Sequence, residues 1–312
     1  MQGQFEQSLD RFSGLANVHD KHRLIPQPVY HKGIYLVPLW QADNVEIDDS
    51  HQLKSRSGYT RVASGSQIHS MWSNNEVCLY VDGTSLMQLN SSYSSITLRT
   101  GLTPNARMSY ADFNDKIYYS NEFEIGFVRN STDNGVVDPS MSFKKNMPAG
   151  QLLAVYNSSL FVARDDTIYV SDPLCDYYDI RKGYRRFNNR ITMVRPVSDG
   201  IYISDDRIWF MSGPANEDFE LSEAYPSQAL PNTDVNISGQ YVSEEGMQGV
   251  VAIWTSRDGI CLGDSKGKVI SLTESRYDYG TAGTSGTAGI RRRGAAYIRE
   301  INNQRHYINS MY

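Results

Sequence analysis

Three pairs of adjacent aspartates are the residues of this chain with the clearest potential for acid–base chemistry. They are Asp48-Asp49, Asp165-Asp166 and Asp205-Asp206. A glycosidase needs two carboxylates about 5 to 10 Å apart, on either side of the bond that it cleaves. No spacing in the sequence brings two of these pairs into one cleft. Adjacent acids in the turn of a β-hairpin normally supply turn geometry and bonds from side chain to backbone, so we expect turn residues here.

Other motifs that could carry catalysis or bind a metal are weak. Residues Ser256-Arg257-Asp258-Gly259 resemble a turn of sialidase propellers but lack its spacing and its following Trp. His19 and His22 could form part of a metal site, yet no HExxH motif or Cys/His cluster follows them, which favours a solvated loop. The sequence has no GxSxG, P-loop or Rossmann glycine pattern. We therefore predict a protein that is not an enzyme, with no catalytic residue, metal or cofactor.

A glycine-rich run precedes three consecutive arginines. Residues 280–289 consist of Gly, Thr, Ala and Ser, and Arg291, Arg292 and Arg293 follow closely. The run has neither the Lys-Ser/Thr ending nor the preceding strand of a phosphate-binding loop, so we predict a flexible loop. Three arginines can be a solvated turn, or a docking arm that orders against an acidic partner or a phosphate. Both interpretations stand, and the triplet is the candidate site for docking a partner.

Charge and cysteine content exclude several classes of protein. The 312 residues include 30 Lys and Arg against 35 Asp and Glu, a formal charge of −5. Wrapping a nucleic acid requires many cations on one face, which this balance does not favour. Cys78, Cys175 and Cys261 are too few and too scattered for a disulfide framework, consistent with folding in a reducing cytoplasm. No apolar run approaches the ~20 residues of a membrane span, and no signal peptide is expected.

The elements that must position these residues are short strands in a repeat. An apolar triplet, a short polar turn and a second apolar strand recur, with an additional apolar strand before each triplet. The triplets are Leu79-Tyr80-Val81, Ile117-Tyr118-Tyr119, Leu160-Phe161-Val162, Ile201-Tyr202-Ile203 and Ile260-Cys261-Leu262, at steps of 38, 43, 41 and 59 residues. A period of about 40 to 45 residues with short strands is typical of β-propeller blades, which bury their faces by stacking radially.

The repeat predicts an all-β fold, a propeller of about five to six short antiparallel blades with little helix. We expect residues 1–23 to form an N-terminal arm and residues 24–312 a single propeller-like domain, with an insertion near 224–239 where the repeat step lengthens. Strands at 33–40 and 297–308 could complete one blade from both ends. Helical periodicity is limited to 5–12 and 295–304, and Asn302-Asn303 indicates a hairpin turn equally well. A β-sandwich, or two small β domains, remains the alternative.

Three phrases within the first 60 residues form a recognisable series. They are Phe12-Ser13-Gly14-Leu15-Ala16-Asn17-Val18, Asn44-Val45-Glu46-Ile47-Asp48-Asp49-Ser50 and Leu53-Lys54-Ser55-Arg56-Ser57-Gly58-Tyr59. The series resembles the opening of virion proteins of tailed bacteriophages, in which Gly-Leu-Asn-Asn-Val precedes Asn-Val-Asp-Ile-Asp and Gly-x-Leu-x-x-Arg-x-Gly. Ser171-Asp172-Pro173 and Arg185-Arg186-Phe187 are similar to that group as well. Within that group, the sequence is similar to the tail hub, nozzle or "stabilisation" proteins of short-tailed phages.

The resemblance implies a structural virion protein of the tail, assembled in the host cytoplasm. Such propeller-based proteins plug or extend the portal channel. The expected partners are copies of the same chain in a ring of six, the portal or adaptor and other tail proteins, and phage DNA that passes without sequence recognition. The alternative function is a propeller-type tail protein that binds a carbohydrate or a receptor. A sialidase-like hydrolase is the third possibility.

Overall fold

The computed structural model describes most of the chain from residue 64 to residue 273 and shorter segments on either side. The described residues are 12–15, 29–31, 34–39, 45–47, 50–56, 58, 60–61, 64–74, 76–137, 139–213, 219–242, 247–273, 294–301 and 304–311. Among them are 29 strands and one short 3-10 helix, Gly239–Tyr241, and no α-helix. The expectation of an all-β chain with little helix is confirmed.

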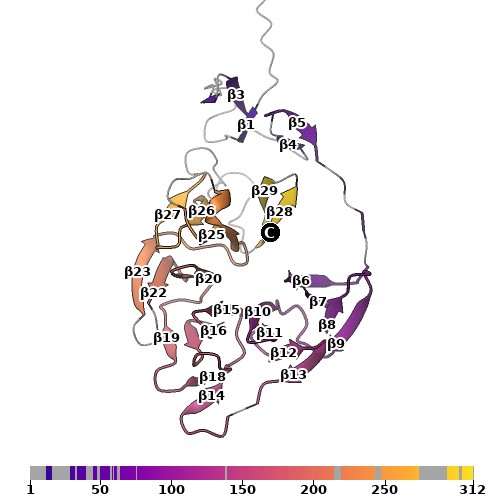
Figure 1. The fold of residues 1–312 in the computed structure, drawn as a ribbon, viewed down its shortest axis with the longest axis vertical. Coiled ribbons are helices and arrows are strands. Elements are labelled where there is room, and N and C mark those ends of the chain that lie inside the picture. Colours follow the sequence, from indigo (N-terminus) through magenta and orange to yellow (C-terminus); the bar gives the residue numbers. More distant parts are fainter. Residues whose placement is uncertain are drawn as a thin grey trace, which may run out of the picture.

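Five four-stranded antiparallel sheets follow one another along the chain and form the blades of a propeller (Figure 1). Blade 1 contains β6 (Ile68–Ser73), β7 (Cys78–Asp82), β8 (Ser85–Leu89) and β9 (Ser95–Arg99). Blade 2 contains β10 (Ser109–Phe113), β11 (Lys116–Ser120), β12 (Ile125–Arg129) and β13 (Thr132–Gly135). Blade 3 contains β15 (Leu152–Tyr156), β16 (Ser159–Arg164), β17 (Thr167–Val170) and β19 (Tyr184–Arg186). Blade 4 contains β20 (Met193–Val197), β21 (Gly200–Ser204), β22 (Ile208–Ser212) and β23 (Glu220–Tyr225). Blade 5 contains β24 (Val235–Ser238), β25 (Val250–Ser256), β26 (Gly259–Gly263) and β27 (Val269–Ser271).

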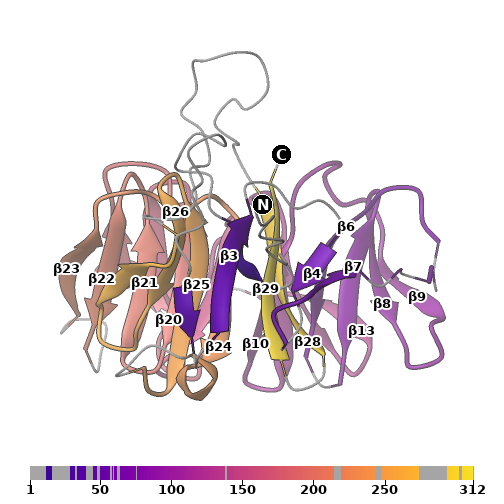
Figure 2. The same cartoon turned by 90° about the horizontal axis from the view of Figure 1, so that it is seen from above.

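The remaining strands form smaller sheets. β14 (Lys144–Asn146) pairs with β18 (Tyr177–Asp179), and β28 (Gly294–Ile301) pairs with β29 (Gln304–Met311). β4 (Val45–Ile47) pairs with β5 (Leu53–Ser55), while β3 (Ile34–Leu39) lies between β1 (Phe12–Leu15) and β2 (Val29–His31). Seen at 90°, the blade strands run from one face of the ring to the other (Figure 2).

Tight turns of Asn with Asp or Ser join several of these strands. Asn114-Asp115, Asn130-Ser131 and Asn157-Ser158 have φ angles between 46° and 60°. Two consecutive residues with positive φ match the right-handed twist of the flanking strands, and Asn tolerates this conformation better than most residues. Short loops therefore hold β10 to β11, β12 to β13 and β15 to β16, and they fix the register of each hairpin.

Apolar clusters between consecutive sheets form the core. One cluster joins blades 1 and 2, a second joins blades 2 and 3, a third blades 3 and 4, and a fourth blades 4 and 5. A fifth joins blade 5 to Tyr307 of β29. Neighbouring residues of a strand serve opposite clusters: Tyr119 packs toward blade 1, and Tyr118 packs toward blade 3. Burial on both faces explains why the central strands read as continuous apolar triplets without alternation.

Each predicted triplet lies on the second strand of its blade in blades 1 to 4, and on the third strand in blade 5, in every case a middle strand of the sheet. Leu79, Ile117, Leu160 and Ile201 are buried, whereas Ile260 is only partly buried. The repeat also predicts that the first residues of the five triplets occupy equivalent places in their blades, and this prediction is wrong. Leu79 and Ile260 pack toward the following element of the propeller, whereas Ile117, Leu160 and Ile201 pack toward the preceding blade. The apolar pattern of blade 1 is displaced by one residue, and Ile260 lies on a third strand, whose pattern begins on the other face.

Other expected elements have definite places. Residues 295–304 belong to the β28–β29 hairpin and are not helical. Residues 33–40 include β3, which pairs with β1 and β2 and shares no described sheet with β28 or β29. Residues 224–239, expected as an insertion, hold the end of β23, a connection and β24, the first strand of blade 5. Of the predicted arm 1–23, only β1 is described, and the loop 280–289 lies outside the described residues.

Candidate functional site: the central cavity and the blade junctions

A cavity of about 610 Å³ lies where the first strands of the blades converge. Its walls come from β6, β10, β15, β20 and β24, which is one strand from each blade, together with the start of β25. These first strands are the innermost ones of the ring (Figure 1). The lining includes Trp72, Tyr110, Asp112, Tyr156 and Arg195, so the cavity is both aromatic and polar.

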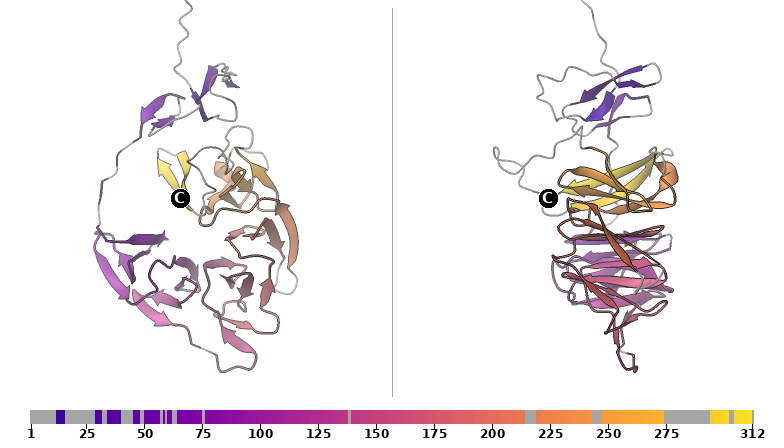
Figure 3. Two further views of the ribbon diagram at one scale, coloured as in Figure 1. Left: turned by 180° about the vertical axis from the view of Figure 1, so that it is seen from behind. Right: turned by 90° about the vertical axis from the view of Figure 1, so that its left-hand side faces the viewer.

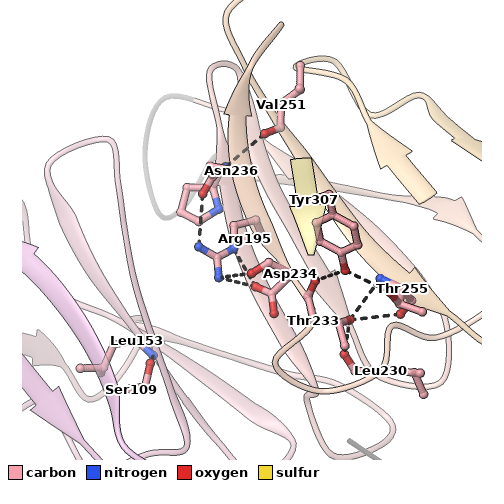
Figure 4. A network of polar contacts seen from close by, with 11 residues as sticks. Ser109, Leu153, Arg195, Leu230, Thr233, Asp234, Asn236, Val251, Thr255 and Tyr307 are labelled. Atoms are coloured by element: carbon pink, nitrogen blue, oxygen red, sulfur yellow. Dashed lines mark hydrogen bonds and ion pairs between the residues drawn. The ribbon is translucent and has the colours of Figure 1, made fainter. Parts of the chain in front are cut away.

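Arg195 is a cation of this cavity, and its charge is already compensated. Its Nε donates to Oδ2 of Asp234 at 2.6 Å, and its Nη2 lies 2.5 Å from the same oxygen. Nη1 donates to Oδ1 of Asn236 at 3.2 Å, and Nδ2 of Asn236 donates to the carbonyl of Pro196 at 2.6 Å (Figure 4). The guanidinium is therefore oriented and neutralised, and the network fastens blade 4 to blade 5.

Serine side chains fasten the earlier blades in a similar way. The backbone amide of Met108 donates to Ser70 Oγ at 2.9 Å, from the start of blade 2 to blade 1. The amide of Leu153 donates to Ser109 Oγ at 2.9 Å, from blade 3 to blade 2 (Figure 4). A serine at the inner strand thus satisfies an amide that the neighbouring blade would leave unpaired.

An aromatic wall lies on the side of the cavity formed by blades 1 and 2. The rings of Trp72 and Tyr110 are stacked, with centroids 5.9 Å apart and an interplanar angle of 24°. Tyr110 is buried, and no described group accepts from its hydroxyl. Burial raises the pKa of Tyr110 far above the ordinary tyrosine value, so this phenol stays protonated. The wall is therefore apolar, and the polar groups of the cavity come from other lining residues such as Asp112 and Arg195.

The predicted aspartate pairs in the described residues are turn residues. Asp165 has a φ of 54° in the β16–β17 turn, and Oδ2 of Asp166 lies 2.7 Å from Nε of Arg186. The hydrogen bond from Arg186 holds the pKa of Asp166 below its usual value. Asp205 is buried in the β21–β22 turn and accepts from Nε1 of Trp209 at 2.9 Å, while Asp206 pairs with Arg207. The pairs lie in different turns, and Asp48-Asp49 is outside the described residues.

The remaining candidate residues have the following places. Ser256-Arg257-Asp258-Gly259 forms the β25–β26 turn, where Ser256 Oγ accepts from the amide of Asp258 at 3.1 Å. His19, His22 and the docking candidates Arg291, Arg292 and Arg293 lie outside the described residues. Cys78, Cys175 and Cys261 all lie in described segments, and none of them is in a disulfide. Within the described segments, no group of three or more His, Cys, Asp or Glu is placed to hold a metal ion. The same segments contain no helix long and apolar enough to cross a membrane.

A small two-stranded extension carries surface features that the sequence did not reveal. β14 and β18 lie at the periphery of the ring (Figure 1), next to Phe143 and Leu174, which are 54% and 62% exposed. Both have positive φ, 64° and 57°, which is strained for bulky side chains. The guanidinium of Arg181 lies 4.4 Å from the centroid of the Phe143 ring. Single apolar residues within polar loops give no sequence signal, so this surface could not be predicted.

Asp179 anchors this extension. Its side chain is 2% exposed, and its Oδ2 lies 2.7 Å from Nη2 of Arg181 and 3.3 Å from Nζ of Lys144. Oδ1 accepts from the backbone amide and Nε of Arg181, both at 3.0 Å. Hydrogen bonds from Arg181, and then the bond from Lys144, hold the pKa of Asp179 far below the ordinary aspartate value. The carboxylate therefore stays ionised and ties β18 to β14.

The β28–β29 hairpin contacts blade 5, the segment between blades 1 and 2, and the β4–β5 hairpin. The hydroxyl of Tyr307 donates to the carbonyl of Thr233 at 2.5 Å, and Nδ2 of Asn309 donates to Thr255 Oγ1 at 2.5 Å. Nη1 of Arg107, which lies between blades 1 and 2, donates to the carbonyl of Gly294 at 2.8 Å. A pair distant in sequence completes the junction: Nη2 of Arg299 lies 2.6 Å from Oε1 of Glu46 in β4.

Comparisons with known proteins find similar solved structures and no family. No protein-family model and no curated protein matches the chain. Similar solved structures include BBS1N in complex with ARL6DN, at a TM-score of 0.50 and 11% identity, covering 84% of this chain and 82% of the other. The Pan2 WD40 domain of Neurospora crassa has a TM-score of 0.44 and 11% identity, with 66% of each chain covered. The WD40 propeller of Doa1 has a TM-score of 0.42 and 13% identity, covering 67% and 70%. At such identities the likeness concerns the β-propeller fold alone.

Proposed function

We propose that the protein is a structural virion protein, a subunit of a phage tail connector, hub or nozzle that forms part of the DNA channel below the portal. The observation that carries the proposal is the place of the phrases resembling phage virion proteins. Residues 44–50 and 53–59 contribute β4 and β5, and Glu46 of the first phrase pairs with Arg299 of β28. The phrases thus belong to a hairpin that meets the last strands of the propeller.

Two further features support an assembly role. The propeller predicted from the repeat is the architecture that the resemblance implies for this group. Several bulky apolar side chains stand exposed on the blades and their loops: Phe143, Leu174, Phe123 at 64% and Val137 at 81%. Covering such side chains with another protein removes apolar surface from water, which favours association. We infer contacts with neighbouring copies, six in the ring, and with the portal or adaptor and other tail proteins.

Purified particles test the proposal directly. A tagged copy is expressed during infection by the source phage, and virions are separated from free protein on a density gradient. The tag should sediment with the particles, and gold-labelled antibody should mark the tail. A tag that stays entirely in the soluble fraction, while particles remain complete, would contradict a virion role.

The arginine triplet is part of this proposal as a docking contact, because an Arg fork pairs well with the carboxylates of a neighbour. Replacing Arg291, Arg292 and Arg293 by Ala should leave the free protein folded and prevent its incorporation into particles. Circular dichroism checks the fold, and the gradient above measures incorporation. Normal incorporation of the triple variant would identify the triplet as a solvated turn.

Carbohydrate or receptor binding is the alternative function, and the aromatic wall of the central cavity favours it. Trp72 and Tyr110 present stacked rings in a cavity that Asp112 and Arg195 also line. Sugars pack on such rings while polar groups bind their hydroxyls. A glycan array with the intact protein and with Trp72→Ala separates the two functions, because only the alternative predicts binding that the substitution abolishes. We also propose that the protein catalyses no reaction, and a turnover assay on host surface polysaccharide tests this.

A further inference from the structure

The junction between the β28–β29 hairpin and blade 1 is built differently from the other junctions of the ring. Buried apolar clusters join every consecutive pair of elements from blade 1 to Tyr307 of β29. Among the described residues, no such cluster joins β28–β29 to blade 1. A contact described at this end is polar, from Nη1 of Arg107 to the carbonyl of Gly294. Within the described part of the chain, apolar clusters thus lie at five junctions, and the contact described at the sixth is polar.

The β28–β29 hairpin is also incomplete as a blade. It has two strands, whereas each of the five blades has four. A two-stranded hairpin is only marginally stable alone, and its outer edge presents backbone groups that another strand can pair with. The β4–β5 hairpin lies on the outer side of β28–β29 (Figure 1, Figure 3), as a separate two-stranded sheet.

The contact between the two hairpins includes a shielded ion pair. The side chains of Arg299 and Glu46 are 13% and 15% exposed, and their closest N and O atoms are 2.6 Å apart. Nη2 of Arg299 also lies 3.1 Å from Nδ1 of His306 on β29. The hydrogen bond from Arg299 lowers the pKa of Glu46, so this carboxylate is ionised at neutral pH. An ion pair sheltered from water is sensitive to the sign of each partner.

The connection from β5 to β6 allows the β4–β5 hairpin to reach beyond the propeller of its own chain. It runs along the outside of the molecule (Figure 1), and every described residue between 56 and 67 is exposed. A stretch of this length spans up to ~40 Å when extended. Because the described part of the connection is not packed into the core, moving the hairpin would leave the five blades intact.

We propose that the β4–β5 hairpin of one copy docks on the β28–β29 hairpin of a second copy, with Glu46 of one copy pairing with Arg299 of the other. The inference rests on the proposed function, and it names the partner of the closing hairpin as a neighbouring copy in the ring. The contact is heterologous, because the surface that gives and the surface that receives are different, as a closed ring requires. The same contacts form within one molecule or between molecules, so the local concentration of neighbours decides which form is populated.

Charge-reversed variants of the full-length protein test this exchange in solution. One variant carries Arg299→Glu, the other carries Glu46→Arg, and each has a different affinity tag. Alone, each variant places like charges at the contact, both within one molecule and between identical copies. In an equimolar mixture, each β28–β29 hairpin meets an opposite charge only on the other variant. The double variant, with both substitutions in one molecule, is the matched control, because its own hairpins are complementary.

The measurement is analytical ultracentrifugation at tens of micromolar, with capture on one tag to detect the other. We expect monomers from each single variant alone and complexes with equal amounts of both variants from the mixture, with ~10-fold more association than either variant shows alone. The double variant should sediment like the wild type. Monomers throughout the mixture, with circular dichroism showing that both single variants are folded, would overturn the exchange. Only pure protein is used, so this result leaves the virion location to its own test.

Discussion

Arg195 and Asp234 form an ion pair across the boundary between blades 4 and 5, with Nη2 and Oδ2 2.5 Å apart. Arg195 lies on β20, the inner strand of blade 4, and Asp234 immediately precedes β24, the inner strand of blade 5. The Asp234 side chain is 6% exposed and the Arg195 side chain is 31% exposed. This ion pair therefore joins blades 4 and 5 at the wall of the central cavity, in addition to the apolar cluster between the same blades.

Removing one member of this pair should destabilise the protein. Asp234→Leu leaves the guanidinium of Arg195 without its carboxylate, and we expect a loss of about 2–3 kcal/mol, moderated by the partial exposure of Arg195. The double variant Arg195→Met/Asp234→Leu should recover most of the loss, since no charge is left unpaired. Urea unfolding followed by tryptophan fluorescence measures both. Glu223→Gln provides the control, because the Arg207–Glu223 pair is exposed and should contribute less than about 1 kcal/mol.

Burial should rank the stability losses at two isoleucines that each begin one of the repeated apolar triplets. Ile201 is fully buried between blades 3 and 4, and Ile260 is partly buried in the cluster of blade 5 and β29. Ile201→Ala should cost about 2–5 kcal/mol, because the rigid blade junction retains the cavity. Ile260→Ala should cost about half as much, since part of its surface already contacts water. Equal losses in urea unfolding would contradict the difference in burial between these two residues.

The fold was predictable because the same apolar triplet is needed in every blade. A middle strand is covered on both faces, so Leu160-Phe161-Val162 and Ile201-Tyr202-Ile203 are apolar without alternation and stand out in the sequence. The face of each residue was not predictable from the triplet. Ile260-Cys261-Leu262 lies on the third strand of its blade and not on the second, yet it is just as apolar as the other triplets, while Ile260 and Leu262 face the following hairpin and Cys261 faces blade 4.

The polar contacts were harder to predict than the core. Arg195 and Asp234 are 39 residues apart, and Glu46 and Arg299 are 253 apart. The fold brings the two residues of each pair together, and no sequence motif with a characteristic spacing contains either pair. The turn function of Asp165 and Asp205 was predictable, because a hairpin turn is local. The exposed Phe143 was not, since a single aromatic residue in a loop has no pattern around it.

Gly263 is required by two rings packed against the end of β26. A Cβ at this position would lie 2.6 Å from Cζ of Tyr202 and 2.8 Å from Cζ3 of Trp254, and both rings are fully buried. Gly263→Ala should therefore destabilise the protein by about 1–3 kcal/mol through overpacking. Gly135→Ala is the matched control at the end of an outer strand, where a Cβ meets nothing within 4 Å. Thermal unfolding that shifts equally in both variants would contradict this account.

Acid should loosen the β14–β18 extension through protonation of Asp179. Hydrogen bonds from Arg181, then from Lys144, lower the pKa of Asp179 in the folded protein from an ordinary value of 3.8. A group whose folded pKa is depressed stabilises the fold above its unfolded pKa, and that contribution declines as the pH falls below about 3.8. Asp179→Asn removes the contribution at neutral pH and should flatten this part of the acid dependence, measured as the free energy of unfolding against pH.

Amide exchange locates the effect within the molecule. The amide of Ile180 donates to the carbonyl of Phe143 at 2.9 Å, and the amide of Met147 donates to the carbonyl of Asp176 at 3.1 Å, so both report on the extension. In Asp179→Asn these amides should exchange faster at pH 7, while amides of β16 and β21 keep wild-type protection. Asp165→Asn is the control, because the Asp165 side chain is 72% exposed and lies in a different turn. Unchanged protection of Ile180 and Met147 in Asp179→Asn would show that strand pairing, and not the buried carboxylate, holds the extension in place.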